Sequence, residues 1–269
     1  MSIIKHGFIF FAIGLIGCSS PIKDSDLIRF KGEYRNLAKA VEKEDTSAIH
    51  RIVSEQGLDV NYQEPKFGET LLMWAVQYEK YESCKVLLKL GADPNLKSID
   101  NETSALMFSA KNYKTSDFLK LLLNYGGDAN DSSDYKGVHY LRTPLISASS
   151  TRLESVKLLL QKGANINYMS HHHQTALRAA IDSKYINIAH YLMIEMGADF
   201  NPTLGSTIHG DTLFIVNSLR RCAFPLDSKE HKLKMEIVDY MLKRGVNYWE
   251  TPVPIHYYKN YDSTYLNKY

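Results

Sequence analysis

The sequence predicts an all-α repeat solenoid of about six units, including the units that cap its two ends. The main observation is a recurring phrase, an apolar run followed by Gly-x-Asp/Asn-x-Asn, as in Leu87 to Asn95. A second phrase, which opens with Thr or Ser and continues with small and apolar residues, falls between successive copies of the first. Self-similarity at such a period is typical of stacked repeats. The glycines of the first phrase stand at positions 57, 91, 126, 163, 197 and 245, at intervals of 34, 35, 37, 34 and 48 residues.

Each unit is expected to contain two antiparallel helices and a projecting hairpin. The second phrase predicts a short first helix, because a Thr or Ser at the N-cap accepts a hydrogen bond from an amide of the first turn. Pro144 suits the first helical position, where its missing N–H costs nothing. The expected N-cap residues are Thr70, Ser104, Thr143, Thr175 and Thr212.

The apolar run of the first phrase predicts the second helix of each unit, with a Leu-rich face such as Val156, Leu159 and Leu160. The glycine then supplies the left-handed residue that ends this helix. The Asp and Asn side chains that follow are expected to tie the turn. No unit buries its apolar face alone, so stacking of the units must form the core.

The two phrases together resemble the ankyrin repeat, with its Thr-Pro-Leu-His-x-Ala opening and its Gly-Ala-Asp-x-Asn close. The resemblance covers roughly residues 35–250. The 48-residue interval departs from the pattern and predicts an insertion at about residues 222–231, between the two helices of the last unit. The His of the opening never occurs, so its hydrogen bonds must be missing or replaced. Its places are taken by Met73, Met107, Ile146, Arg178 and Phe214.

The two ends of the solenoid, predicted to span residues 34–250, need caps. The first unit has apolar residues inside a charged segment, as expected of a solvated end cap. The tail, residues 251–269, repeats Tyr every four residues and would place these rings on one helical face. This face is expected to seal the last unit, although a docking strip or a disordered tail remains open. The tail tyrosines are Tyr257, Tyr261, Tyr265 and Tyr269.

Residues 1–17 are predicted to be a signal peptide. An uncharged apolar run of eleven residues, from Gly7 to Gly17, follows Lys5 and His6. As a helix this run reaches about 16 Å, half of a bilayer core, so it is not an anchor helix. The sequence Leu-Ile-Gly before Cys18 resembles the lipobox of bacterial lipoproteins. The resemblance implies that Cys18 is lipidated, that residues 18–33 hold the lipid and a linker, and that the protein lies at the outer membrane, facing the periplasm.

The chemistry of most enzymes is missing from this sequence. It contains no phosphate-binding glycine loop, no Gly-x-Ser-x-Gly elbow, no His-Glu-x-x-His and no Cys-x-x-Cys. We therefore expect no catalytic residues and no cofactor. A net charge of +2 is too balanced for a nucleic-acid-binding protein. Cys84 and Cys222 are separated by several units, so they are expected to be buried filler, not a disulfide.

Histidine is the one polar residue type that clusters in the sequence. Five of the ten histidines lie in the loops before three consecutive units, where hairpin tips would place them along one ridge. A metal site, a pH-sensitive contact and a polar part of a binding surface remain open as interpretations. These residues are His139, His171, His172, His173 and His209.

The resemblance implies a protein-binding module, since ankyrin repeats contact partners through hairpin tips and the exposed end of the first helix. Transferred to this sequence, the expected contact residues are Lys66, Phe67, Tyr78, Asp100, Asn101, His139, Tyr140, Arg142, His171, His172, His209 and Arg220. Small bacterial ankyrin-repeat lipoproteins are in some cases immunity partners of a secreted toxin such as a lipase. A scaffold for an envelope protein, or a metal or pH sensor built on the histidines, are the alternatives.

Overall fold

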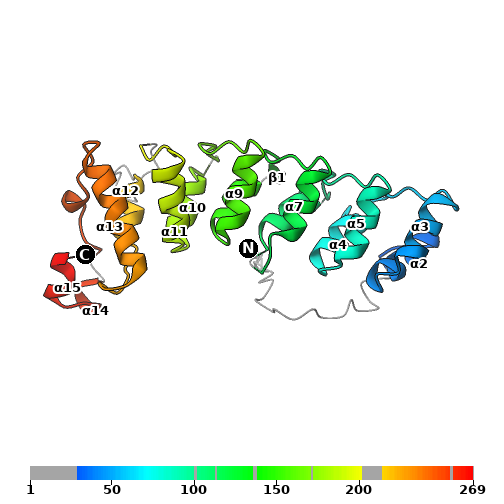
Figure 1. Cartoon of the computed structure of the whole chain (residues 1–269), viewed down its shortest axis with the longest axis horizontal. Helices are drawn as coiled ribbons and strands as arrows, with labels where there is room; N and C mark the ends of the chain where they lie inside the picture. The colour runs from blue at the N-terminus through cyan, green and yellow to red at the C-terminus, as the bar shows by residue number, and fades with distance from the viewer. Residues whose placement is uncertain are drawn as a thin grey trace, which may run out of the picture.

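The computed structural model of the chain describes residues 29–99, 102–112, 114–135, 138–170, 172–201, 214–254 and 257–268. It leaves the side chains of residues 134, 135, 138–141 and 267 outside that description. Figure 1 shows helix pairs standing side by side in chain order, from α2 at one end to α13 near the other. This arrangement confirms the predicted all-α repeat solenoid.

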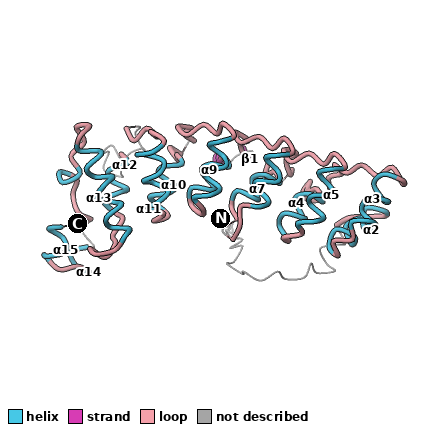
Figure 2. The backbone as a smooth tube through the Cα atoms, in the orientation of Figure 1, coloured by secondary structure: helices cyan, strands magenta, loops and turns pink. Residues whose placement is uncertain are grey.

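Each unit consists of a first helix and a second helix joined by a short turn, and Figure 2 shows loops linking one pair to the next. The pairs are α2 (Glu33–Glu42) with α3 (Thr46–Ser54), α4 (Leu71–Gln77) with α5 (Tyr81–Lys89), α6 (Ala105–Ala110) with α7 (Asp117–Asn124), α8 (Pro144–Ser149) with α9 (Leu153–Gln161), α10 (Ala176–Asp182) with α11 (Ile186–His190), and α12 (Ile215–Arg220) with α13 (Lys229–Leu242). A π-helical turn, η1 (Tyr191–Glu195), extends α11.

The hairpin before α8 forms two short antiparallel strands, β1 (Ser133–Tyr135) and β2 (Val138–Arg142). This connection, residues 125–143, is longer than those before α6 and α10, which span residues 90–104 and 162–175. Its extra length is what allows a two-stranded ladder to form between the third and fourth helix pairs. The chain ends in a 3-10 turn, η2 (Tyr248–Glu250), and two short helices, α14 (Tyr257–Asn260) and α15 (Ser263–Lys268).

Four of the five expected N-caps are confirmed. The hydroxyls of Thr70, Ser104, Thr143 and Thr175 each accept a hydrogen bond from the amide three residues later. The sulfur of Met73 accepts a hydrogen bond from the Thr70 amide at 3.5 Å, so it replaces one bond of the missing His.

The fifth N-cap prediction is wrong. Thr212 lies outside the described residues, but α12 begins at Ile215, so Phe214 occupies the N-cap position. Asn217 then stands where the other units have Met73 or Ile146, and its Oδ1 accepts a hydrogen bond from the Phe214 amide at 2.8 Å. The last unit is therefore shifted by two residues relative to the register expected from its sequence, and Asn217, not Phe214, takes the place of the family's His.

The expected insertion between the two helices of the last unit is confirmed, since residues 221–228 separate α12 from α13. The corresponding connection between α4 and α5 spans only residues 78–80. The second helix is also longer in this unit, because α13 has 14 residues whereas α5 has nine. Both changes lengthen the final interval.

The recurring glycines end the second helices as predicted, with positive φ at all six positions. The polar residues after them form two kinds of hydrogen bond, one within their own turn and one to the next unit, and the sequence did not predict this difference. Asp93 ties its own turn, since its Oδ1 accepts from the Asn95 amide at 2.8 Å. Asn95 instead reaches the next unit, where its Nδ2 donates to the Gly126 carbonyl at 2.9 Å and its Oδ1 accepts from the Asp128 amide at 2.8 Å.

The same contact recurs along the array. Asn61 bonds to the Gly91 carbonyl and the Asp93 amide, and Asn130 bonds to the Gly163 carbonyl and the Asn165 amide. These asparagines therefore hold neighbouring units at a constant spacing, because each one satisfies two backbone groups of the following turn.

The core is one continuous cluster of buried side chains that runs from Phe30 to Tyr248. In the first unit, only one face of each helix contributes to it, which is consistent with the expected end cap. The residues of this unit that the sequence suggested for the core are all buried: Leu37, Ala38, Ala40, Val41, Ile49, Ile52 and Val53.

The tyrosine tail folds against the last unit, but not as one helix. The chain breaks between α14 and α15, where the Asp262 carboxylate accepts a hydrogen bond from the Tyr265 amide at 2.7 Å. The Tyr257 hydroxyl donates to the Arg221 carbonyl, and the Tyr265 hydroxyl donates to the Phe224 carbonyl at 2.8 Å. The tail therefore covers the connection between α12 and α13. Tyr269 lies outside the described residues.

None of the helices in the described ranges has the length and apolar character that crossing a membrane requires. The predicted signal peptide and Cys18 lie outside these ranges. Cys84 and Cys222 are free and buried, as expected for filler. Burial raises the pKa of the Cys84 thiol to about 12 and that of the Cys222 thiol to about 11, so both are protonated at neutral pH.

Candidate protein-binding surface

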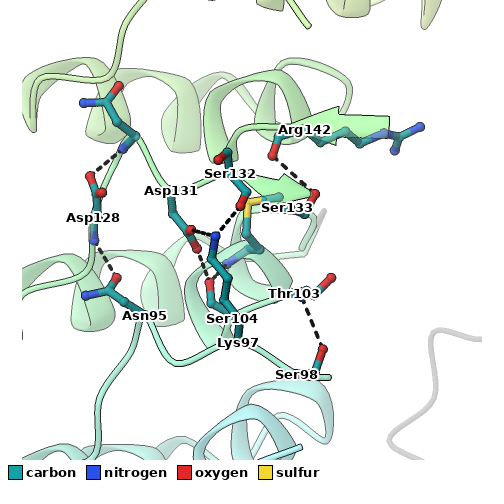
Figure 3. Close-up of polar contacts among 12 residues, drawn as sticks. Asn95, Lys97, Ser98, Thr103, Ser104, Asp128, Asp131, Ser132, Ser133 and Arg142 are labelled. Carbon is teal, nitrogen blue, oxygen red and sulfur yellow. Dashed lines mark hydrogen bonds and ion pairs between the residues drawn. The ribbon is translucent and has the colours of Figure 1, made fainter. Parts of the chain in front are cut away.

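The hairpins are fixed to one another by buried polar contacts. In Figure 3 the Lys97 ammonium lies beside Asp131, with 3.2 Å between Nζ and Oδ1, and it also donates to the Ser132 carbonyl. The Ser104 hydroxyl donates to the other Asp131 oxygen at 2.6 Å. Asp131 is buried, so these partners compensate its charge. This cluster joins the loop before α6 to the loop before β1 and makes this edge of the solenoid rigid.

The tip of the hairpin before α4 is organised by Glu64, whose side chain is completely buried. Its carboxylate accepts hydrogen bonds from the Lys66 amide at 2.8 Å and the Phe67 amide at 2.6 Å. The Gln63 amide group donates to the Gly68 and Lys97 carbonyls, so it also connects this tip to the next hairpin. The backbone that presents Lys66 and Phe67 is therefore held in one conformation.

Two expected contact residues, Lys66 and Phe67, lie together at this tip. Lys66 is exposed and Phe67 is half-buried, with the Lys66 ammonium 4.7 Å from the centre of the Phe67 ring. The Arg29 guanidinium lies at the same distance from this ring and forms an ion pair with Glu69, with 3.1 Å between Nη1 and Oε2. The ring therefore remains partly accessible between two cations.

Ile99 is a residue of this surface that the sequence did not single out. It is 70% exposed, and its amide donates to the Phe67 carbonyl at 2.7 Å. A Cβ at Gly68 would lie 2.5 Å from the Ile99 side chain, and Gly68 has φ +68°, so only glycine permits this close approach. No periodic pattern marks Ile99, because its exposure follows from how two hairpin tips meet.

The structure describes only some of the remaining expected contact residues before α8. Tyr78 is half-buried at the end of α4, with its ring centre 5.4 Å from that of Trp74. Arg142 is exposed at the end of β2. Asp100 and Asn101 lie outside the described residues, and so do the side chains of His139 and Tyr140 on β2.

The histidines are only partly described, so the predicted ridge stays a prediction. His172 is exposed, while His173 is half-buried with a positive φ of 54°. The Arg178 side chain donates to the carbonyls of both residues, at 3.4 Å and 3.2 Å. His171 and His209 lie outside the described ranges. Within those ranges, no three His, Cys, Asp or Glu side chains are grouped so that they would hold a metal ion.

Arg220 must be removed from the candidate surface, because its side chain is only 5% exposed. The two-residue shift of the last unit explains this burial. Counted from the N-cap, Arg220 takes the position of Val76 in α4 and Ile181 in α10, and both of these side chains are buried. The position equivalent to Tyr78 is taken by Cys222, which is also buried, and the exposed arginine here is Arg221.

The buried Arg220 belongs to a polar cluster in the last unit. Its guanidinium lies 4.5 Å from the centre of the Tyr248 ring, and the Lys234 ammonium lies 5.2 Å from the same ring. Lys234 is completely buried and donates to the Cys222 carbonyl at 2.9 Å. Burial, and then the charge of Arg220, lower the pKa of Lys234 from 10.5 to about 7, although the nearby Cys222 raises it.

This pKa makes the stability of the protein depend on pH. Between pH 7 and 10.5 the unfolded chain binds a proton at Lys234 that the folded chain does not, so stability rises with pH. Above pH 9 the two buried thiols oppose the rise, because they ionise more readily in the unfolded chain. We expect the free energy of unfolding to increase by roughly 2 kcal/mol from pH 7 to pH 9.

Urea unfolding followed by circular dichroism at several pH values would measure this increase. Lys234→Met should remove it, while Lys232→Met, which changes an exposed lysine of the same helix, should keep it. An equal slope in the wild type and in Lys234→Met would contradict the assignment.

Comparison with known proteins agrees with the fold. Residues 106–203 match the family model described as ankyrin repeats (3 copies), and residues 67–99 match the model described as ankyrin repeat. An ankyrin repeat protein of Acanthamoeba polyphaga mimivirus is 33% identical over 84 residues, which are 31% of this chain and 50% of that protein. The two family matches together fall on the helix pairs from α4 and α5 to α10 and α11.

Two further similar proteins have other names. Protein PhlB of Serratia liquefaciens is 32% identical over 112 residues, 42% of this chain and 45% of that protein. Glycerophosphocholine phosphodiesterase gde1 of Schizosaccharomyces pombe is 25% identical over 212 residues, 78% of this chain but only 17% of the enzyme. The chain thus spans about half of the first two relatives and a small part of the third, whose match does not indicate catalysis.

Proposed function

We propose that this chain, an ankyrin-repeat solenoid, binds another protein along its hairpin edge while a lipid on Cys18 holds it at a bacterial outer membrane, facing the periplasm. Ankyrin repeats are in general non-catalytic modules that bind proteins. The main support for this surface comes from the hairpin edge, by which we mean the hairpin tips before α4 and α6. Its backbone is held by hydrogen bonds, and Ile99 is 70% exposed there beside Phe67 and Lys66. An exposed apolar side chain on a fixed backbone loses little entropy on binding.

The partner that we propose is a secreted toxin such as a lipase, which this protein would neutralise as an immunity partner. This proposal rests on the resemblance to small bacterial ankyrin-repeat lipoproteins, and on a tether that would keep the solenoid where a toxin enters the periplasm. A scaffold for an envelope protein is the alternative. A gene for a secreted toxin beside the gene for this protein would favour the immunity role.

Affinity capture with the purified full chain, followed by mass spectrometry, tests the proposal. A single secreted hydrolase retained in a one-to-one ratio would support an inhibitor, whereas several envelope proteins would support the scaffold. If no protein is retained from either secreted or envelope fractions, the binding function is wrong.

Variants of the hairpin edge test where the partner binds. Lys66→Glu with Ile99→Asp should weaken binding by at least about tenfold, because it places two unpaired carboxylates where a cation and an apolar side chain would contact the partner. Leu242→Asp with Lys243→Glu is the matched control, because it changes an exposed aliphatic residue and a lysine at the end of α13. Equal affinity of the two double variants would move the binding site away from the hairpin edge.

A further inference from the structure

A groove between two second helices takes no part in the proposed protein-binding surface. It lies between α3 and α5, which stand next to each other at the blue and cyan end of the solenoid in Figure 1, and it has a volume of about 580 Å³. This volume is within the usual range of small-molecule sites, about 300–1,000 Å³. None of the residues that line it belongs to a hairpin.

The lining of this groove combines an apolar floor with positive charge. Val86 and Leu90, both half-buried, pack against the core and form the apolar part. His50 and Arg51 from α3 and Lys89 from α5 are exposed along it. Within the part of the chain that the structure describes, no ion pair engages any of these three side chains. Glu55 is the acidic residue of the lining, so positive charge predominates.

The combination of an apolar floor and positive charge indicates which class of ligand fits the groove. A soluble anion would neutralise Arg51 and Lys89 but leave the apolar floor in water, and a neutral hydrocarbon would do the reverse. A phosphate group that carries a hydrocarbon chain satisfies both parts, because guanidinium and ammonium groups form strong charge-assisted hydrogen bonds to phosphate oxygens. Membrane phospholipids have this structure.

We propose that the groove between α3 and α5 binds an anionic phospholipid, with its phosphate at Arg51 and Lys89 and an acyl chain against Val86 and Leu90. The inference deepens the proposed function and rests on the membrane location assumed there. Residues 19–28, which would link Cys18 to the first described residue, reach at most about 35 Å when extended. The first units are therefore the ones that a tether keeps closest to the bilayer, and lipid in this groove would orient the solenoid on the membrane.

Photolabelling of the full chain with a short-chain phosphatidylglycerol that carries a diazirine in an acyl chain tests the proposal. This probe is soluble as a monomer, so the test does not depend on the tether. We expect the label on peptides that contain Val86 and Leu90, as identified by mass spectrometry. The matching phosphatidylcholine probe should label them about tenfold less, because its positive headgroup cancels the attraction of the groove.

Two comparisons make the result decisive. Arg51→Glu with Lys89→Glu should reduce labelling of these peptides about tenfold, whereas Lys120→Glu with Lys162→Glu, an equal charge change on α7 and after α9, should leave it unchanged. If excess inorganic phosphate does not reduce labelling of these peptides by the lipid probe, the groove recognises the whole lipid. Full competition by phosphate would show a site for free phosphate and overturn the lipid assignment.

Three other results would also overturn the proposal. They are labelling that is spread over the chain, labelling that is equal with both probes, and labelling that Arg51→Glu with Lys89→Glu does not change. None of these results would bear on the capture of a protein partner, which uses the hairpin edge. Failure of that capture with intact photolabelling would instead reject the protein-binding function alone.

Discussion

Cys18→Ser is expected to move the protein from the membrane fraction to the soluble fraction almost completely. Each buried CH₂ of an acyl chain contributes about 0.8 kcal/mol to membrane binding, and two or more chains hold a protein on a bilayer stably. The apolar run before Cys18 is too short to replace them, because it reaches only about half of the hydrocarbon core. Fractionation, combined with incorporation of an alkyne-labelled palmitate, measures both location and lipidation.

Ser20→Ala is the control for this experiment, since it changes a neighbouring residue without removing the thiol. It should keep the protein in the membrane fraction and keep the palmitate label. If Cys18→Ser still sediments with membranes and still incorporates the label, the tether at Cys18 is wrong.

Trp74→Ala is expected to destabilise the first units by about 3–5 kcal/mol, the range for truncating a buried aromatic residue. Trp74 is only 1% exposed, and its indole donates to Glu69 at 3.0 Å. Its ring centre lies 4.9 Å from that of Phe30. The substitution therefore removes one of the contacts that join the start of the solenoid to the tip carrying Lys66 and Phe67.

The chain has only two tryptophans, which makes the measurement local. In Trp249→Ala, the remaining Trp74 reports unfolding of the first units by fluorescence. In Trp74→Ala, the 44% exposed Trp249 reports the last unit. Since solenoid units are stabilised mainly by their neighbours, we expect Trp74→Ala to lower the urea midpoint by circular dichroism while the Trp249 signal changes less.

Trp74→Phe should recover most of the lost stability, because it keeps an aromatic ring in the core while losing the bond to Glu69. A loss of less than about 1 kcal/mol in Trp74→Ala would show that Trp74 does not organise this end.

Much of the fold followed from the sequence because the units repeat. Thr70 and Thr143 predicted helix starts and Gly91 and Gly163 predicted helix ends, since N-caps and left-handed residues act within a single turn of chain. Comparison of one unit with the next turned these local signals into a register. That register failed only in the last unit, where Phe214 and Asn217 take over the N-terminal cap and Arg220 becomes buried.

The repeat architecture, the helix boundaries of the regular units and the burial of Cys84 and Cys222 could therefore be predicted from the sequence. Which side chains are accessible together depends on how the units pack against one another. Asn95 binds the next turn and not its own, Ile99 is exposed because two hairpin tips meet, and the groove between α3 and α5 depends on how two units pack. Local hydrogen bonding and periodicity act within one unit, whereas these features arise between units that are more than thirty residues apart in the chain.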